Sequence, residues 1–354
     1  MFCCHGTPQE PPAGLVSVHG RRRVAAPILL TASLYRNEFS GYLYAGRLTP
    51  LAEWLSPRPW HHGAPPLRSA AMPTKAASKD LFAAPAAQHA VRIGIGGWTY
   101  APWRKNFYPD DLVQKRELEY ASRQLRVIEI NGTFYGAQKP ATYARWAAET
   151  PEGFVFSLKA PRYIIGAKVL ADTAKGITGF IEGGLDQIGD RLGPILWQLP
   201  PTSRFDADDL DAFLRLLPSK LAGRPLRHVL EVRHPSFLSA EYVALARSHR
   251  IPTVFTDSPQ YPSLADVTGN FTYARLMRSE DGIATGYGAK DLDAWSARAQ
   301  RWAHGKDNPE LPHVASALPD DGAREVFIFF ISAAKHRNPA AAMALQARVD
   351  KAHR

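Results

Sequence analysis

Charged side chains that could do chemistry stand at the ends of short apolar runs. Glu129, Glu231 and Asp257 each close such a run, and Lys159 closes another. Carboxylates whose environments separate their pKa values can act as the acid and the base of a reaction. A buried lysine can form a Schiff base, but we expect the three carboxylates to keep Lys159 charged. These four residues are the catalytic candidates.

Further polar and aromatic residues at or just after these runs are candidates for ligand binding: Trp98, Tyr100, Asn131, Tyr135, Arg162, Tyr163, Gln198, Arg233, His234 and Arg275. The convergence of charges from several runs favours a ligand site. The structural alternative is that the charges pair with one another and only close the fold. Glu129 then pairs with Lys159, and Glu231 pairs with Arg233 or Arg275.

His234 with the carboxylates could hold a divalent metal through imidazole and oxygen ligands. The alternative is a histidine fixed by the His-Pro turn that it begins. We expect no cofactor and no metal.

The elements that would position these residues alternate regularly from residue 91 onward. Apolar runs typical of buried parallel strands cover 91–96, 127–131, 154–160, 194–199, 228–233, 253–257, 271–276 and 325–331. Helical periodicity covers 114–125, 141–149, 176–192, 208–217, 240–249, 291–304 and 339–352. The sixth crossover, 260–268, is too short for a full helix. Eight such units predict an α/β protein, a single (β/α)8 TIM-type barrel over 91–354, with an open doubly wound sheet as the alternative. The candidate residues then share the C-terminal face, where barrels of this type carry their sites.

Residues 1–90 have a different character. The first 71 hold nine of the 29 prolines and little periodicity. Arg21-Arg22-Arg23 precedes a short apolar stretch, but a proline interrupts that stretch, so export is the weaker interpretation. Met72 opens an alanine-rich lead-in and resembles a natural start. We expect a disordered or spurious extension over 1–90.

Composition restricts the class of protein. No run of 18 apolar residues indicates a membrane span. Cys3 and Cys4 are the only cysteines, which excludes cysteine chemistry from the barrel region, fits a reducing compartment and favours a cytoplasmic protein. The net charge of +10 divides into +4 from residues 1–71 and +6 from the rest. Nucleic-acid binding is therefore possible only through local contacts.

Standard signatures of nucleotide and hydrolase sites are absent. Thr99 occupies the position of the third glycine after Gly94 and Gly96, so a Rossmann fingerprint fails. A series of blocks does match a known family. In order they are IGIGGWTYAPW at 93–103, FYP at 107–109, VIEINGTFY at 127–135, PEGFVFSLK at 151–159, RY at 162–163, LGPILWQLPP at 192–201, EVRHPS at 231–236 and DSP at 257–259. The region 91–350 resembles the domain-of-unknown-function 72 (YecE-like) family, which implies a TIM-barrel fold and no established reaction.

The sequence departs from the family pattern on one side of the expected pocket. Pro161 replaces a serine and Gly166 a histidine, and Met277 replaces another histidine. Ile331 and Ser332 stand where the family has two asparagines, and a proline-containing insertion covers 306–321. The departures predict a pocket that is more apolar beside the last two strands.

Two classes of function remain open, with a third behind them. The first is an enzyme acting on a small polar or anionic substrate by carboxylate acid/base chemistry, a hydrolase or a lyase or isomerase. The second is a nucleic-acid-binding or metal-dependent nuclease-like barrel that stacks bases on the aromatic residues of 98–108. The third is a non-catalytic binding protein. The sequence does not indicate an oligomeric state.

Overall fold

The computed structural model describes residues 90–319 and 322–352. The expectations for residues 1–89 lie outside this part of the chain. Eight parallel strands form the central sheet: β1 (Val91–Gly96), β2 (Val127–Ile130), β3 (Val155–Lys159), β4 (Leu192–Gln198), β7 (Arg227–Glu231), β8 (Val254–Thr256), β9 (Phe271–Leu276) and β10 (Glu325–Phe330). Each strand lies within two residues of its predicted limits.

The sheet closes into a barrel. Its strand order is β7-β4-β3-β2-β1-β10-β9-β8, so β7 and β8 stand at the two ends. A parallel bridge joins Leu230 to Thr253, and the Leu230 amide donates to the Pro252 carbonyl at 2.9 Å. This contact brings the two ends together and confirms the barrel over the open sheet.

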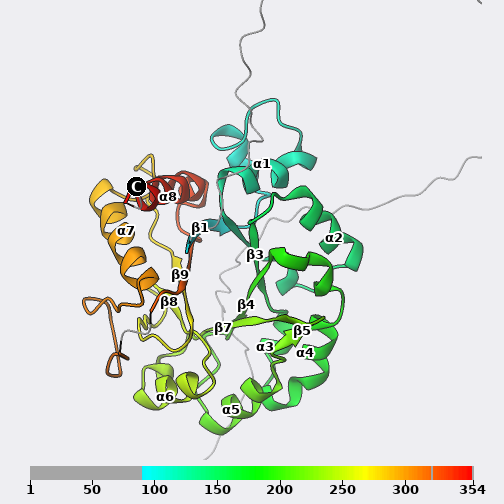
Figure 1. Ribbon diagram of the computed structural model, residues 1–354, viewed down its shortest axis with the longest axis vertical. Coiled ribbons are helices and arrows are strands. Elements are labelled where there is room, and N and C mark those ends of the chain that lie inside the picture. Colours follow the sequence, from blue (N-terminus) through cyan, green and yellow to red (C-terminus); the bar gives the residue numbers. More distant parts are fainter. Residues whose placement is uncertain (1–89, 320–321, 353–354) are drawn as a thin grey trace, which may run out of the picture. The chain divides into compact units, whose positions relative to one another are not determined.

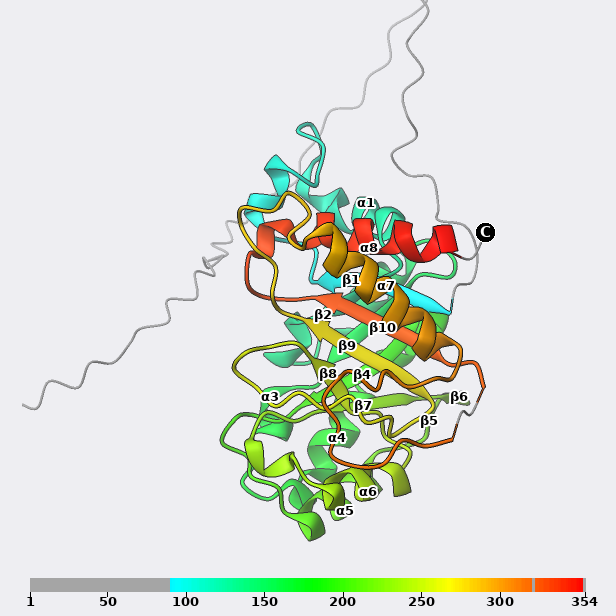
Figure 2. The ribbon, with the colours of Figure 1, turned by 90° about the vertical axis from the view of Figure 1, so that its left-hand side faces the viewer.

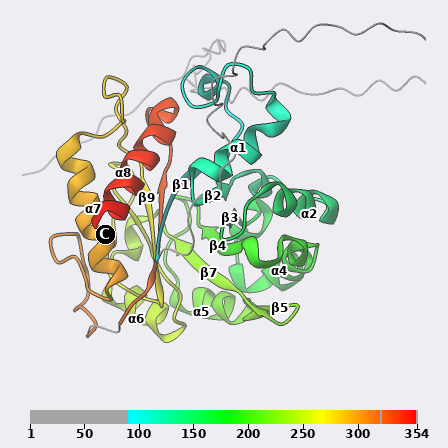
Figure 3. The ribbon, with the colours of Figure 1, turned by 45° about the horizontal axis from the view of Figure 1, so that its top comes forward.

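Helices surround the strands (Figure 3). They are α1 (Glu117–Gln124), α2 (Pro140–Glu149), α3 (Arg162–Ile165), α4 (Ala174–Ile181), α5 (Ala207–Leu216), α6 (Ala240–Ser248), α7 (Ala289–Ala303) and α8 (Asn338–Ala352). The two long helices α7 and α8 lie side by side over β10 and β1 (Figure 2). No helix follows β8, as predicted for the sixth crossover, and Figure 1 shows this segment as an irregular chain.

One predicted helix is broken. The helical pattern of 176–192 becomes α4 and a separate 3-10 segment, Leu185–Arg191. Gly184, between them, has a φ of +113° and lies against Pro140, where a Cβ would come within 2.7 Å of the proline ring. Periodicity cannot reveal this break, because it follows from the close approach of α2 and from a backbone angle that glycine tolerates.

A short hairpin was not predicted. β5 (Lys220–Leu221) and β6 (Arg224–Pro225) pair antiparallel between α5 and β7. Its tip holds Ala222 and Gly223 at positive φ angles of 47° and 80°, as two-residue hairpin turns require. The two-residue strands are too short to give an alternating pattern.

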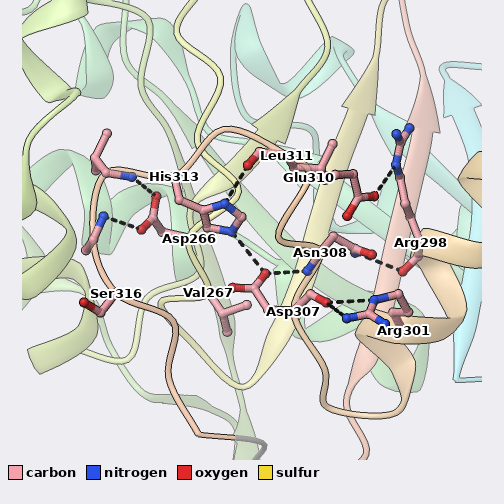
Figure 4. Close-up of polar contacts among 12 residues, drawn as sticks. Asp266, Val267, Arg298, Arg301, Asp307, Asn308, Glu310, Leu311, His313 and Ser316 are labelled. Carbon is pink, nitrogen blue, oxygen red and sulfur yellow. Dashed lines mark hydrogen bonds and ion pairs between the residues drawn. The ribbon is translucent and has the colours of Figure 1, made fainter.

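The insertion before β10 is fixed to the barrel by polar contacts (Figure 4). The buried Asp266 carboxylate accepts hydrogen bonds from the amides of Val314 and Ala315 at 3.0 and 2.9 Å. His313 lies between the Asp307 carboxylate and the Leu311 carbonyl, at 3.1 and 2.6 Å. The segment is therefore held by charged and backbone groups together with Leu311, Val314 and Ala315, which pack against the core.

The barrel interior changes character along its axis. At the N-terminal end Glu325 forms ion pairs with Arg92 and Arg227, and both arginines lie over the Phe327 ring. A cluster of apolar and aromatic side chains lines the barrel: Val127, Val155, Leu196, Val229, Val254, Phe271, Tyr273, Met277, Phe327, Phe329 and Ile331. Side chains along a strand alternate between its two faces. A residue two positions after a member of this cluster therefore also points into the barrel, and several such residues at the C-terminal end are charged or polar.

Candidate functional site

Six side chains form what we call the mouth cluster, at the C-terminal end of the barrel. They are Glu129, Lys159, Gln198, Glu231, Arg233 and Arg275. Four of them come two residues after a side chain that lines the barrel, so each continues the inward face of its strand. The pairs are Val127 and Glu129, Leu196 and Gln198, Val229 and Glu231, and Tyr273 and Arg275. The apolar run below and the charge at its end are thus two parts of one alternating pattern.

Arg275 joins two carboxylates from opposite parts of the ring. Its Nε and Nη2 donate to Glu129 at 3.1 and 3.0 Å, and its Nη1 donates to Glu231 at 2.7 Å. All three residues are buried, with 2% or less of their surface exposed. A guanidinium and two carboxylates removed from water stabilise one another only when their hydrogen bonds are satisfied, as they are here.

The two carboxylates have further partners. Tyr273 donates its hydroxyl to Glu129 at 2.8 Å. Gln198 and Arg233 donate to Glu231 at 2.8 and 2.7 Å. Burial alone would raise the pKa of Glu231, but Arg275 and Arg233 outweigh it and lower that pKa to about 2. Glu231 is therefore an anchor for the arginines that stays ionised at neutral pH.

Lys159 is different, because no hydrogen bond or ion pair holds its amine within the described residues. Its Nζ lies 4.0 Å from the centre of the Phe134 ring, while its carbonyl accepts from Thr133 at 2.7 Å. Burial and the charge of Arg275 lower the pKa of Lys159 from 10.5 to about 8, with Glu129 and Glu231 only partly opposing them. At this pKa most Lys159 amines remain charged at pH 7, but the pairing of Glu129 and Glu231 with arginines leaves a larger neutral fraction than an ordinary lysine has.

Arg233 stands above Glu231 at the rim of the mouth. Its Nε is held by Glu231, and its guanidinium lies 4.1 Å from the centre of the Tyr261 ring. Nη1 and Nη2 have no hydrogen-bond partner among the described residues, and the side chain is 16% exposed. Two fixed, unfilled donors on one planar edge suit a carboxylate or phosphate.

His234 is fixed in one tautomer by the turn that follows β7. Its Nδ1 accepts from the Ser236 amide at 3.1 Å and lies 2.8 Å from the Ser236 hydroxyl. An Nδ1 that accepts an amide hydrogen bond carries no proton, so the proton of the neutral ring is on Nε2. Ser236 is itself oriented by the Phe205 amide at 2.7 Å. His234 therefore presents Nε2 as a donor.

Asp257 does not join the mouth cluster. β8 ends at Thr256, and the Asp257 carboxylate accepts from the Met277 amide and, at 3.0 Å, from the Tyr287 hydroxyl. Burial raises the pKa of Asp257. It lines a separate cavity of about 450 Å³ with Trp295 and Arg298. The expected grouping of three carboxylates is thus reduced to Glu129 and Glu231.

The aromatic residues after β1 are packed against the fold. Trp98 contacts Trp146 edge to face, with ring centres 5.2 Å apart, and its carbonyl accepts from the Tyr108 hydroxyl. Tyr100 packs on the buried Trp103, whose indole donates to the Lys335 carbonyl at 3.0 Å. The rings needed to stack nucleic-acid bases are therefore largely engaged in the core.

The remaining candidates lie towards the rim. Asn131 is close to Gly96, where a Cβ would come within 3.0 Å of its amide nitrogen. Tyr135 and Tyr163 are 62% and 55% exposed, and Arg162 is exposed as well. None of these three exposed side chains contacts the mouth cluster through a hydrogen bond or ion pair within the described residues.

The positions that depart from the family pattern separate into two groups. Met277 and Ile331 belong to the cluster that lines the barrel, and each is 9% exposed. Gly166 is exposed at the end of α3, and Ser332 is exposed with a φ of +59°. The mouth is thus apolar beside β9 and β10, as the sequence predicts.

Two residues of the site were missed from the sequence. Tyr273 reaches both Glu129 and the Ser157 hydroxyl, at 2.8 and 2.9 Å, and its position two residues before Arg275 could have revealed it. Tyr261 lies in an irregular segment, where no periodicity indicates its contact with Arg233.

Two further classes of feature are absent from the described part of the chain. Residues 90–319 and 322–352 contain no group of three or more His, Cys, Asp or Glu side chains that could hold a metal ion. Within these ranges no helix has the length and apolar character to cross a membrane.

Comparison with known proteins agrees with this architecture. Residues 92–354 match the family model described as "Protein of unknown function DUF72". The chain belongs to the DUF72 family. A curated relative, the UPF0759 protein YunF of Bacillus subtilis, is 24% identical over 157 residues, which are 43% of this chain and 54% of YunF. The chain therefore matches about half the length of that relative.

Two solved DUF72 structures share the fold. The protein from Thermotoga maritima is 20% identical, with a TM-score of 0.55 over 75% of this chain and 99% of that one. The protein from Enterococcus faecalis is 17% identical, with a TM-score of 0.55 over 73% of this chain and 95% of that one. These DUF72 proteins support the barrel, and their descriptions name no reaction.

Proposed function

We propose that this DUF72 protein is an enzyme that acts on a small polar carbonyl compound at the mouth of the barrel, with the amine of Lys159 as its nucleophile. The observation that carries the proposal is the unequal pairing of the mouth cluster. Glu129 and Glu231 are fully engaged by arginines, whereas the Lys159 amine faces an aromatic ring and has no anionic partner among the described residues.

The chemistry follows from the state of the amine. With its pKa at about 8, roughly one Lys159 in ten is neutral at pH 7, about 300 times the fraction for a pKa of 10.5. A neutral amine adds to a carbonyl carbon, and loss of one water from the adduct leaves an imine. Protonation of the imine nitrogen gives a cation that can accept the electron pair of a bond broken at the adjacent carbon. The proposed reaction is therefore of the lyase or isomerase class.

Other residues of the site support binding and orientation. The Glu129–Arg275–Glu231 bridge fixes the base of the mouth, and Arg233 presents the Nη edge of its guanidinium at the rim. A cavity of about 820 Å³ between the loops after β3 and β4 is a separate feature, because no residue of the mouth cluster lines it.

The carboxylate acid/base mechanism expected from the sequence is not retained in the proposal. A general base must exchange a proton near the working pH, and the pKa of Glu231 is far below neutrality. Nucleic-acid binding has no specific support either, because Trp98 and Trp103 are engaged in the core.

Reductive trapping tests the proposal. The protein is incubated with pyruvate or hydroxyacetone and sodium cyanoborohydride, which reduces an imine to a stable secondary amine. Mass spectrometry should place the adduct on Lys159, and Lys159→Arg should abolish it. The matched control is Lys168→Arg, at an exposed lysine of a nearby loop, which should leave the yield unchanged. Adducts spread evenly over exposed lysines, with none enriched at Lys159, would overturn the proposal.

A further inference from the structure

The charges of the mouth cluster are not balanced when Lys159 is protonated. Glu129 and Glu231 supply two negative charges, and Arg233 and Arg275 supply two positive ones. Lys159, or an imine cation formed on it, therefore carries one excess positive charge. An excess charge on a partly buried group such as Lys159 is costly until a partner neutralises it. One negative charge on the ligand would complete the site.

Arg233 provides a place for that negative charge. Its Nε contact with Glu231 and its stacking on Tyr261 fix the guanidinium plane, while Nη1 and Nη2 have no partner among the described residues. Both Arg233 and Lys159 follow the inward face of their strands, β7 and β3, which are separated only by β4. Two strand spacings are about 10 Å, a gap that the two long side chains can close around a small molecule.

The opposite part of the mouth is apolar. Met277 follows β9 and Ile331 follows β10, and both side chains are in the cluster that lines the barrel. Within the described residues neither contributes a side-chain hydrogen bond. A substituent that points towards this wall is stabilised by apolar contact and has no polar partner there.

Resting on the proposed function, we infer that the substrate is a 2-oxo carboxylic acid with an apolar substituent. Its carboxylate binds the Nη edge of Arg233, its oxo carbon is attacked by Lys159, and its substituent lies against Met277 and Ile331. A single excess charge favours a carboxylate over a phosphate, which carries close to two charges at neutral pH.

Trapping yields for matched carbonyl compounds test the inference. Pyruvate and hydroxyacetone are of similar size, but only pyruvate carries a carboxylate. The natural protein should give half-maximal labelling of Lys159 at a pyruvate concentration at least tenfold below that of hydroxyacetone. Lactate, which keeps the carboxylate but has a hydroxyl in place of the oxo group, should compete with pyruvate. 4-Methyl-2-oxopentanoate should be trapped at lower concentration than 2-oxoglutarate, whose substituent is charged.

The variant Arg233→Gln separates the two proposals. Loss of the Arg233 charge also raises the pKa of Lys159 and so weakens labelling by both compounds. The variant should therefore raise the half-maximal concentration of pyruvate at least tenfold more than that of hydroxyacetone, with thermal unfolding as the check on folding. Equal trapping of pyruvate and hydroxyacetone by the natural protein, without competition from lactate, would overturn the substrate class and leave Lys159 as the nucleophile. Absence of any adduct on Lys159 with either compound would instead overturn the proposed function. The lactate competition uses the natural protein and so decides the matter even if the variant does not fold.

Discussion

Arg275 is the residue on which the base of the mouth depends most. Replacing it by methionine removes three hydrogen bonds, two to Glu129 and one to Glu231. Glu231 would keep Arg233 and Gln198, but Glu129 would keep only the Tyr273 hydroxyl. Breaking a buried ion pair from one side costs about 3–5 kcal/mol. Because a domain is typically stable by about 5–15 kcal/mol, we expect Arg275→Met to lose a large part of its free energy of unfolding.

Urea unfolding followed by circular dichroism measures the loss, and a second substitution identifies its cause. Glu129→Gln added to Arg275→Met should recover at least about 1 kcal/mol, because the unpaired carboxylate is then gone. The control is Arg298→Met, which breaks the exposed pair with Glu310 and should cost less than about 1 kcal/mol. A loss for Arg275→Met no larger than that of the control would refute the argument, as would a double variant no more stable than Arg275→Met.

Three further predictions concern pH and the loops. Glu231, with a pKa lowered from 4.5 to about 2, contributes stability above pH 4.5 that is lost as the pH falls towards 2. In Glu231→Gln the free energy of unfolding should therefore decline less steeply between pH 4.5 and 2 than in the natural protein. Parallel pH profiles of the two proteins would contradict this. Ala333 has a φ of +48°, so Ala333→Gly should stabilise the protein by roughly 0.5–1 kcal/mol in urea unfolding. The control Ala334→Gly, at a φ of −73°, should not stabilise it. Equal effects of the two substitutions would argue against backbone strain at Ala333. Asp266→Ala should release the segment that contains Val314 and Ala315 and speed limited proteolysis there. The control Glu310→Ala, which removes an exposed ion pair with Arg298, should not speed it. Unchanged cleavage in Asp266→Ala would show that other contacts hold the segment.

The sequence predicted the barrel well because strand residues carry a strong pattern. Runs such as 325–331 are apolar almost throughout, and a charged or polar side chain at the end of a run indicates the mouth of a barrel. Glu129, Lys159, Gln198, Glu231 and Arg275 were found in this way. The helix break at Gly184 escaped because it depends on contact with Pro140, a residue far away in sequence.

The roles within the site could not be predicted in the same way. Asp257 comes after a run like the others, but its strand ends one residue earlier, at Thr256, and its carboxylate bonds to Met277 and Tyr287. The state of Lys159 depends on which residues Arg275 and Arg233 pair with. Pairing across the barrel is a property of the closed structure, and several pairings were equally compatible with the sequence.

The most direct test of the central claim is the pKa of the Lys159 amine in the intact protein. Competitive acetylation over a range of pH, followed by mass spectrometry of the lysine-containing peptides, gives the ionisation of each lysine, with the exposed Lys168 and Lys175 as internal controls. Lys159 should titrate with a midpoint near 8, well below the 10.5 of an ordinary lysine. A midpoint for Lys159 equal to those of Lys168 and Lys175 would contradict the account, because the amine would then be an ordinary ammonium group at neutral pH.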